Sequence, residues 1–254
     1  MKRYMIVGNW KMNKTIAETE TFINELMPLL PVKNKNEIVI CPPYLALQKA
    51  VELTTGSTVK VGAQNMHYEA SGVYTGEVSA EMLQEIGVNY CIIGHSSRRE
   101  FDNDTDVKIN KKLMKALENG MTPILCVGET KKEKDANRTY RVLKKQLLLD
   151  FEGIQNPENI VIAYEPLWAI SDGKTPAPTP TLKEIASVNS GIKRVLRQIY
   201  KPEVVKKIKI LYGVSVNPSN AGEIMAERSV HGVLVGGACL VPEKYASIVK
   251  SVVK

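Results

Sequence analysis

Cysteine is scarce in this sequence, and no two cysteines form a C-x-x-C pair. Each of the four, Cys41, Cys91, Cys126 and Cys239, stands in an apolar run. We therefore expect reduced, buried thiols and a cytoplasmic protein. Long hydrophobic runs are missing too, and the N-terminus leads into a strand rather than a signal peptide. This pattern predicts a chain that does not associate with a membrane.

Aromatic residues make up only 6% of the 254 residues, and they do not alternate with basic ones. Nucleic-acid-binding surfaces combine these two kinds of residue, so we expect no nucleic-acid partner. The net charge of +7 could favour anionic ligands. Lysine-rich segments such as 131–134 have the pattern of solvated turns, however, and we attribute the excess charge to the surface.

Motifs for cofactors and covalent chemistry are also missing. No glycine-rich fingerprint follows the first predicted strand. Gly173-Lys174-Thr175 imitates the end of a P-loop, but Trp168 stands where its first glycine should be. Gly94-His95-Ser96 resembles a nucleophile elbow, but Arg98 occupies the final glycine position. With no cluster of metal ligands either, we expect no cofactor and no metal.

Eight short apolar runs predict strands, and amphipathic patterns between them, such as 108–119 and 138–151, predict helices. The predicted strands are 4–7, 37–41, 59–61, 90–93, 123–127, 159–164, 207–211 and 232–235. No change in composition marks a linker. Eight strands that alternate with eight helices favour a single α/β domain over residues 1–254, a (β/α)₈ barrel, rather than a doubly wound sheet.

Several residues predict where helices begin and where a loop projects. Thr15 with Glu18 and Thr181 with Glu184 fit a capping box. Asn217-Pro218 and Pro242 predict two further helix starts. The glycine-bearing stretch 65–75 predicts an ordered, projecting loop.

Polar or glycine residues follow seven of the predicted strands. Because barrel active sites lie at the carboxyl ends of the strands, we expect these residues to share one face. They are Asn9, Lys11, Gln64, Asn65, His95, Glu129, Glu165, Ser215, Gly236 and Gly237.

These residues suggest separate catalytic and binding roles. Glu165 ends its strand at Pro166 and precedes an apolar segment that could close as a lid, which suits a general base. His95 precedes a short helix, whose N-terminus favours a neutral ring that donates a hydrogen bond. Lys11 supplies a positive charge, and Gly236-Gly237 with Ser215 could hold a phosphate. The set predicts aldose–ketose isomerisation of a small phosphorylated sugar through an enediolate.

Seven ordered motifs along almost the whole chain resemble those of the triosephosphate isomerases. They are Gly8-Asn9-Trp10-Lys11-Met12-Asn13, Gly62-Ala63-Gln64-Asn65, Thr75-Gly76-Glu77, Gly94-His95-Ser96, Cys126-Val127-Gly128-Glu129, Tyr164-Glu165-Pro166-Leu167-Trp168-Ala169 and Val235-Gly236-Gly237-Ala238.

The resemblance implies that Glu165 is the base and His95 the neutral electrophile, a pair of roles for which this family is the well-known example. Lys11 and Asn9 would stabilise the enediolate oxygens, and a lid over 166–176 would close. The phosphate would meet amides near Ser171, Ser215, Gly236 and Gly237. The loop around Thr75 would reach into the partner subunit of a homodimer, and no cofactor is implied.

The sequence departs from the family at a few positions. Ser97 replaces a glutamate, Val214 a glycine and His231 an aspartate, and Ser171 with Asp172 alters the lid tip. Valine resists a positive φ, so the loop movement that accompanies lid closure could be hindered. Two alternatives therefore stay open: an isomerase of a four-carbon ketose phosphate, and a barrel that has lost catalysis and serves as a binding protein.

Overall fold

The computed structural model describes residues 2–170 and 178–252. Eight parallel strands form a closed barrel in sequence order, and β8 pairs with β1 to complete it. The predicted (β/α)₈ barrel is thereby confirmed. The strands are β1 (Met5–Asn9), β2 (Glu37–Cys41), β3 (Val59–Ala63), β4 (Tyr90–Ile93), β5 (Thr122–Val127), β6 (Val161–Tyr164), β7 (Lys209–Gly213) and β8 (Gly232–Val235).

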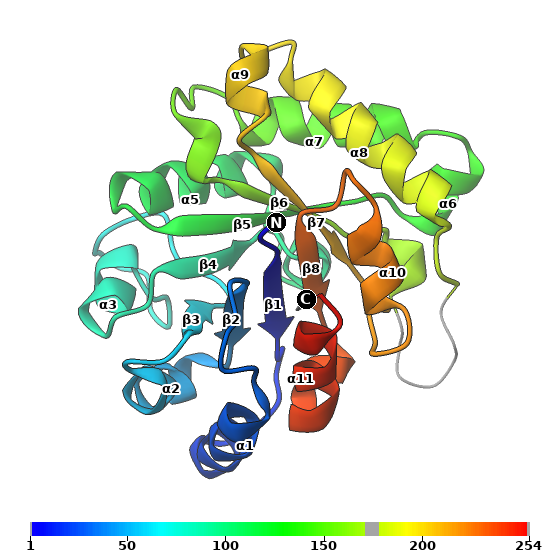
Figure 1. The fold of residues 1–254 in the computed structure, drawn as a ribbon. Coiled ribbons are helices and arrows are strands. Elements are labelled where there is room, and N and C mark those ends of the chain that lie inside the picture. Colours follow the sequence, from blue (N-terminus) through cyan, green and yellow to red (C-terminus); the bar gives the residue numbers. More distant parts are fainter. Residues whose placement is uncertain (1, 171–177, 253–254) are drawn as a thin grey trace.

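Helices surround the barrel, with α1 packed between α2 and α11 (Figure 1). The α-helices of the described residues are α1 (Ile16–Leu29), α2 (Leu47–Thr54), α3 (Ala80–Glu85), α4 (Ser96–Phe101), α5 (Asp106–Glu118), α6 (Lys131–Asp135), α7 (Thr139–Asp150), α8 (Leu182–Leu196), α9 (Pro202–Val205), α10 (Ala221–Ala226) and α11 (Pro242–Lys250). Short 3₁₀ helices are η1 (Tyr44–Ala46), η2 (Pro157–Asn159), η3 (Leu167–Ala169) and η4 (Gly237–Leu240).

The strands are buried on both faces, as their continuous apolar runs require. In β1, Met5 and Val7 belong to the cluster inside the barrel, while Ile6 belongs to the larger cluster between strands and helices. Side chains of a strand alternate between its two faces, so one short run serves both clusters. A rigid barrel of this kind holds the residues at its strand ends in fixed positions.

Most predicted boundaries agree with the structure to within two residues. The capping boxes at Thr15 and Thr181 are both present, and Pro242 does begin α11. The prediction that Asn217 caps a helix is wrong. Its side chain accepts the amide of Ser219 within a turn, and α10 begins only at Ala221.

The lysine-rich segment 131–134 is not a turn. It belongs to α6, which a capping box between Thr130 and Glu133 begins. Helix propensity of lysine and this unnoticed cap outweigh the charge pattern that suggested a solvated turn.

The four cysteines are free and buried, as predicted. Among the described residues, no helix is both long and apolar enough to span a membrane.

Candidate active site

A cavity of about 560 Å³ opens at the carboxyl ends of the strands. It brings together the residues predicted to act on a substrate: Asn9, Lys11, His95, Glu165, Ser215, Gly236 and Gly237. Ser171 and Asp172 lie outside the described residues. A larger cavity, of about 720 Å³, lies at the opposite end, is lined by basic side chains such as Lys33 and Lys60, and contains none of the predicted site residues. The smaller cavity is therefore the candidate active site.

Glu165 and His95 meet inside this cavity. Oε1 of Glu165 lies 3.5 Å from Nε2 of His95, and both side chains are buried. The second carboxylate oxygen, Oε2, is buried with no hydrogen-bond partner among the described residues. A buried oxygen without a partner is costly unless another molecule uses it. The side chain of Glu165 lines the cavity, where a carboxylate can act as a proton acceptor.

Neighbouring strands hold the backbone and side chain of Glu165. Its N–H donates to the carbonyl of Val127 at 2.8 Å, which continues the pairing of β6 with β5. On the other side, a Cβ at Gly213 would come within 2.7 Å of Glu165 Cγ. Glycine at the end of β7 therefore makes room for the carboxylate. This role cannot be predicted from the sequence, since it depends on how closely two strands approach.

The thiol of Cys126 lies beside Glu165. Burial, reinforced by the negative charge of Glu165, raises the pKa of this thiol well above its usual value. A neutral thiol is a poor nucleophile, so Cys126 is a packing residue of the site.

His95 is the N-cap of α4, where Nδ1 accepts the backbone N–H of Ser97 at 3.3 Å. A backbone N–H can only donate, so Nδ1 bears a lone pair and the proton of the neutral ring is on Nε2. Nε2–H is the nitrogen that faces the cavity and Glu165. The ring is thus oriented to donate a hydrogen bond to a substrate oxygen.

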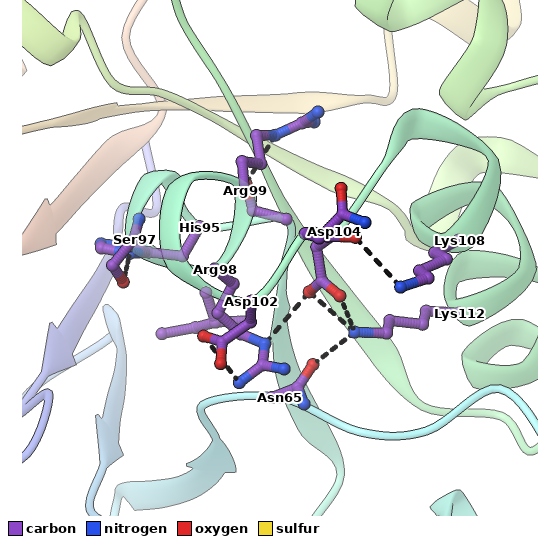
Figure 2. Close-up of polar contacts among 12 residues, drawn as sticks. Asn65, His95, Ser97, Arg98, Arg99, Asp102, Asp104, Lys108 and Lys112 are labelled. Atoms are coloured by element: carbon purple, nitrogen blue, oxygen red, sulfur yellow. Dashed lines mark hydrogen bonds and ion pairs between the residues drawn. The ribbon is translucent and has the colours of Figure 1, made fainter.

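Two arginines anchor helix α4. Arg99 donates from Nε to the carbonyl of Gly94 at 2.8 Å and from Nη2 to Asp150 at 3.3 Å. Arg98 pairs with Asp104 at 3.0 Å and with Asp102 at 3.5 Å, as Figure 2 shows. Charge-assisted bonds of this kind restrain a helix end more firmly than neutral ones.

A buried lysine extends the anchoring network to the projecting loop. Lys112 donates to both carboxylate oxygens of Asp104, at 2.7 and 2.8 Å, and to the side-chain oxygen of Asn65 at 2.8 Å (Figure 2). Burial lowers the pKa of Lys112, and its contacts with Asp104 partly offset this effect. Asn65 therefore serves the scaffold around His95 rather than the cavity.

Lys11 adopts a left-handed backbone conformation, with φ at 53°. Its N–H donates to Oδ1 of Asn9 at 3.0 Å, and its carbonyl accepts from Nε2 of Gln64 at 2.8 Å. A non-glycine residue in this region costs on the order of 1–3 kcal/mol, and such strain is concentrated at functional sites. The bonds hold Lys11 where its side chain reaches the cavity.

Glu129, predicted among the strand-end residues, lies outside the cavity and anchors the segment after β6. It accepts hydrogen bonds from Tyr164 Oη at 3.1 Å and from Trp168 Nε1 at 3.0 Å. Ser215 reaches the same segment, because its hydroxyl donates to the carbonyl of Ala169 at 2.7 Å. Two polar contacts therefore position the described part of the predicted lid.

Gly236 and Gly237 face the cavity at the start of η4. A Cβ at either position would meet no atom within 4 Å, so the space beside both Cα atoms is open. A glycine backbone that is open on this side lets an anion such as phosphate approach closely. The cavity is also lined by Val214, Leu234 and Lys244, which are not among the residues predicted from the sequence to form the site.

No group of three or more His, Cys, Asp or Glu side chains is arranged to hold a metal ion within residues 2–170 and 178–252.

Comparisons with known proteins agree over nearly the whole chain. The sequence profile of the family described as Triosephosphate isomerase matches residues 4–252. The triosephosphate isomerase of Alkaliphilus metalliredigens is 47% identical, over 98% of this chain and 99% of its own. That of Aquifex aeolicus is 46% identical, with the same coverage. The crystal structure of triosephosphate isomerase from Bartonella henselae superposes with a TM-score of 0.87 at 34% identity, over 98% of both chains. This chain belongs to the triosephosphate isomerase family.

Proposed function

We propose that Glu165, His95, Lys11 and Asn9 carry out the family's reaction in this chain. The chain interconverts D-glyceraldehyde 3-phosphate and dihydroxyacetone phosphate. The relatives described above carry the name triosephosphate isomerase. Nothing among them favours a four-carbon substrate or a barrel without catalysis.

The observation that carries the assignment of roles is the buried pair of Glu165 and His95, 3.5 Å apart. In our proposal Glu165 removes the proton from C2 of the aldehyde and returns it to C1. Nε2–H of His95 donates to the aldehyde oxygen O1, and the ring then takes up the proton of O2. Proton transfer to and from neighbouring carbons by one base requires that the base stay close to both, which a rigid strand end provides.

The remaining polar groups would stabilise the charge that develops on the oxygens. The ammonium of Lys11 and the amide of Asn9 reach the same cavity. A positive charge near an enediolate is worth more in a site that excludes water than in solution. No cofactor and no metal takes part in the proposed steps.

The phosphate would be bound by backbone amides of Gly236 and Gly237 and by Ser215. The Ser215 hydroxyl is already bonded to Ala169, so its backbone N–H is the donor that we assign to phosphate. Barrels commonly bind phosphate with the loops after the seventh and eighth strands and a short extra helix, here η4. Ser171 would add a further contact, as the family resemblance implies.

We also propose a cytoplasmic homodimer. The loop 64–79 around Thr75 exposes Val73 almost fully and Tyr74 in part, and apolar side chains at a projecting tip favour insertion into a partner. Sedimentation equilibrium at micromolar concentration should give twice the mass of one chain.

The proposed cytoplasmic location is supported by the four buried free thiols, which agree with a reducing compartment.

The test of the proposed roles is Glu165→Gln, which keeps the size of the side chain and removes the base. General-base catalysis contributes about 10²–10⁴-fold, so we expect kcat to fall by at least 10²-fold. The dissociation constant of inorganic phosphate should stay the same, because the phosphate contacts lie elsewhere in the cavity. Turnover of the variant at the wild-type rate would refute the assignment of Glu165.

A further inference from the structure

Ser97 stands close to the one ring nitrogen of His95 that does not face the cavity. Its Oγ lies 2.8 Å from Nδ1 of His95. The backbone N of Ser97 lies 3.3 Å from the same atom. Donor–acceptor distances are typically about 2.7–3.2 Å for an N–H donor and about 2.5–3.0 Å for an O–H donor, so the hydroxyl is the better placed of the two partners. Figure 2 shows the side chain of Ser97 directed at the His95 ring.

The chemistry of this contact follows from the ring's tautomer. Nδ1 carries a lone pair when the proton is on Nε2, and the Ser97 hydroxyl can donate to it. The glutamate that the family has at this position would be an ionised acceptor, which cannot donate to Nδ1. The hydroxyl contact therefore depends on the serine that this chain has at position 97. Within residues 2–170 and 178–252 no other hydrogen-bond partner of the hydroxyl is found.

The start of α4 holds the side chains of Ser97 and His95 next to each other. Both belong to the start of α4, whose backbone is restrained by the bond from Arg99 to the carbonyl of Gly94 at 2.8 Å. His95 is buried and Ser97 is half-buried. The contact is therefore partly shielded from water, which strengthens it.

We propose that the Ser97 hydroxyl is a positioning group for His95. It donates to Nδ1, holds the ring in the Nε2–H tautomer and fixes the direction of Nε2–H toward the substrate oxygen. This inference rests on the proposed function of His95 as the electrophile. Ser97 itself touches no reacting atom.

The role predicts a specific kinetic change in Ser97→Ala, which removes the hydroxyl and leaves the backbone N–H. One lost hydrogen bond corresponds to a decrease in kcat of about three- to tenfold. KM should stay within about twofold, because the groups assigned to phosphate are untouched. The change must be sought in kcat, since a diffusion-limited kcat/KM would conceal it. Ser97→Thr keeps the hydroxyl and should restore kcat.

A second readout reports on the ring without any turnover. The chain has three histidines, His67, His95 and His231, so the ¹⁵N resonances of the His95 ring can be assigned by single substitutions. In the wild type we expect the Nε2–H tautomer, with Nδ1 shifted by a hydrogen-bond donor. In Ser97→Ala the Nδ1 resonance should move toward that of a nitrogen without a donor, and Ser97→Thr should reverse the change.

The control is Ser57→Ala, which removes a hydroxyl that accepts the N–H of Val59 at 3.1 Å at the other end of the barrel. It should alter neither kcat nor the His95 resonances. An unchanged Nδ1 resonance together with unchanged kcat in Ser97→Ala would overturn the proposal. Loss of the proposed function is a separate outcome: a wild type that fails to turn over glyceraldehyde 3-phosphate would refute the reaction, while the resonances would still test the contact.

Discussion

Gly213 offers a direct test of how closely the base is positioned, because one added methyl group would collide with it. A Cβ at this position lies 2.7 Å from Glu165 Cγ and 3.3 Å from its Oε1. Carbon atoms in contact prefer about 3.5–4.0 Å, so in Gly213→Ala the glutamate must move by roughly 1 Å. A displacement of this size can lower turnover by about 10²-fold. We expect a decrease of that order in kcat.

The same substitution should change stability only modestly. Gly213 does not have a positive φ, so alanine can adopt its backbone conformation and gains about 0.4–1 kcal/mol through the unfolded state. Overpacking costs about 1–3 kcal/mol in comparable cases. A neighbouring cavity of about 440 Å³, lined in part by Ser96, Cys126 and Glu165 itself, gives the carboxylate space to retreat. The net loss should be about 1 kcal/mol, and the variant should fold.

Steady-state kinetics and a crystal structure of Gly213→Ala would check this prediction. Gly222→Ala is the matched control: the site is in α10, and an added Cβ would approach no atom closer than 3.6 Å. It should gain about 0.5–1 kcal/mol of stability with kcat unchanged. The reasoning fails if Gly213→Ala keeps kcat within twofold and its Glu165 is not displaced.

Two further substitutions test residues that depart from the family. Val214 holds φ at 74°, so Val214→Gly should relieve about 1–3 kcal/mol of strain. The variant also loses a buried valine side chain, at a cost of about 1.5–3 kcal/mol, and about 0.5–1 kcal/mol to chain entropy. The free energy of unfolding in urea should therefore fall by only about 1 kcal/mol, and a loss above about 3 kcal/mol would contradict the strain. Burial, with the nearby charges of Lys193 and Lys2, lowers the pKa of His231 from 6.5 to about 4. Between pH 4 and 6.5 His231 is protonated in the unfolded chain and neutral in the folded chain. The free energy of unfolding should therefore fall as the pH drops from 6.5 toward 4, by about 1–2 kcal/mol once partial solvent exposure is allowed for. His231→Gln should remove this part of the pH dependence, and equal slopes for both proteins would contradict it.

The barrel and the list of strand-end residues could be predicted because each depends on local pattern. The runs 37–41 and 90–93 each follow an asparagine and end before Pro42 or Gly94, and the structure has strands at the same positions. Once the strands are parallel and closed, their carboxyl ends must share a face. Asn9, His95 and Glu165 consequently lie in one cavity, although the last lies 156 positions after the first in the chain.

Roles that depend on distances between elements could not be predicted. Glu129 follows a strand as Glu165 does, yet its carboxylate is bonded to Trp168 and Tyr164 and does not reach the cavity. Ser97 was noticed only as the loss of a glutamate, and its contact with Nδ1 of His95 depends on the rotamers of both side chains. The error at Asn217 has a similar origin, since an asparagine before proline can begin either a helix or a turn.

The end of β7 and the loop after it connect Glu165, the proposed base, with η3, the described part of the proposed lid. Gly213, the last residue of β7, approaches the side chain of Glu165. Ser215, in the loop that follows, donates to the carbonyl of Ala169 in η3. Val214 lies between them with a strained φ of 74°. A change of backbone conformation at Val214 would therefore alter both contacts together. Because valine is more restricted than glycine in this region, the strain acts at the residue that lies between the contact with Glu165 and the contact with η3.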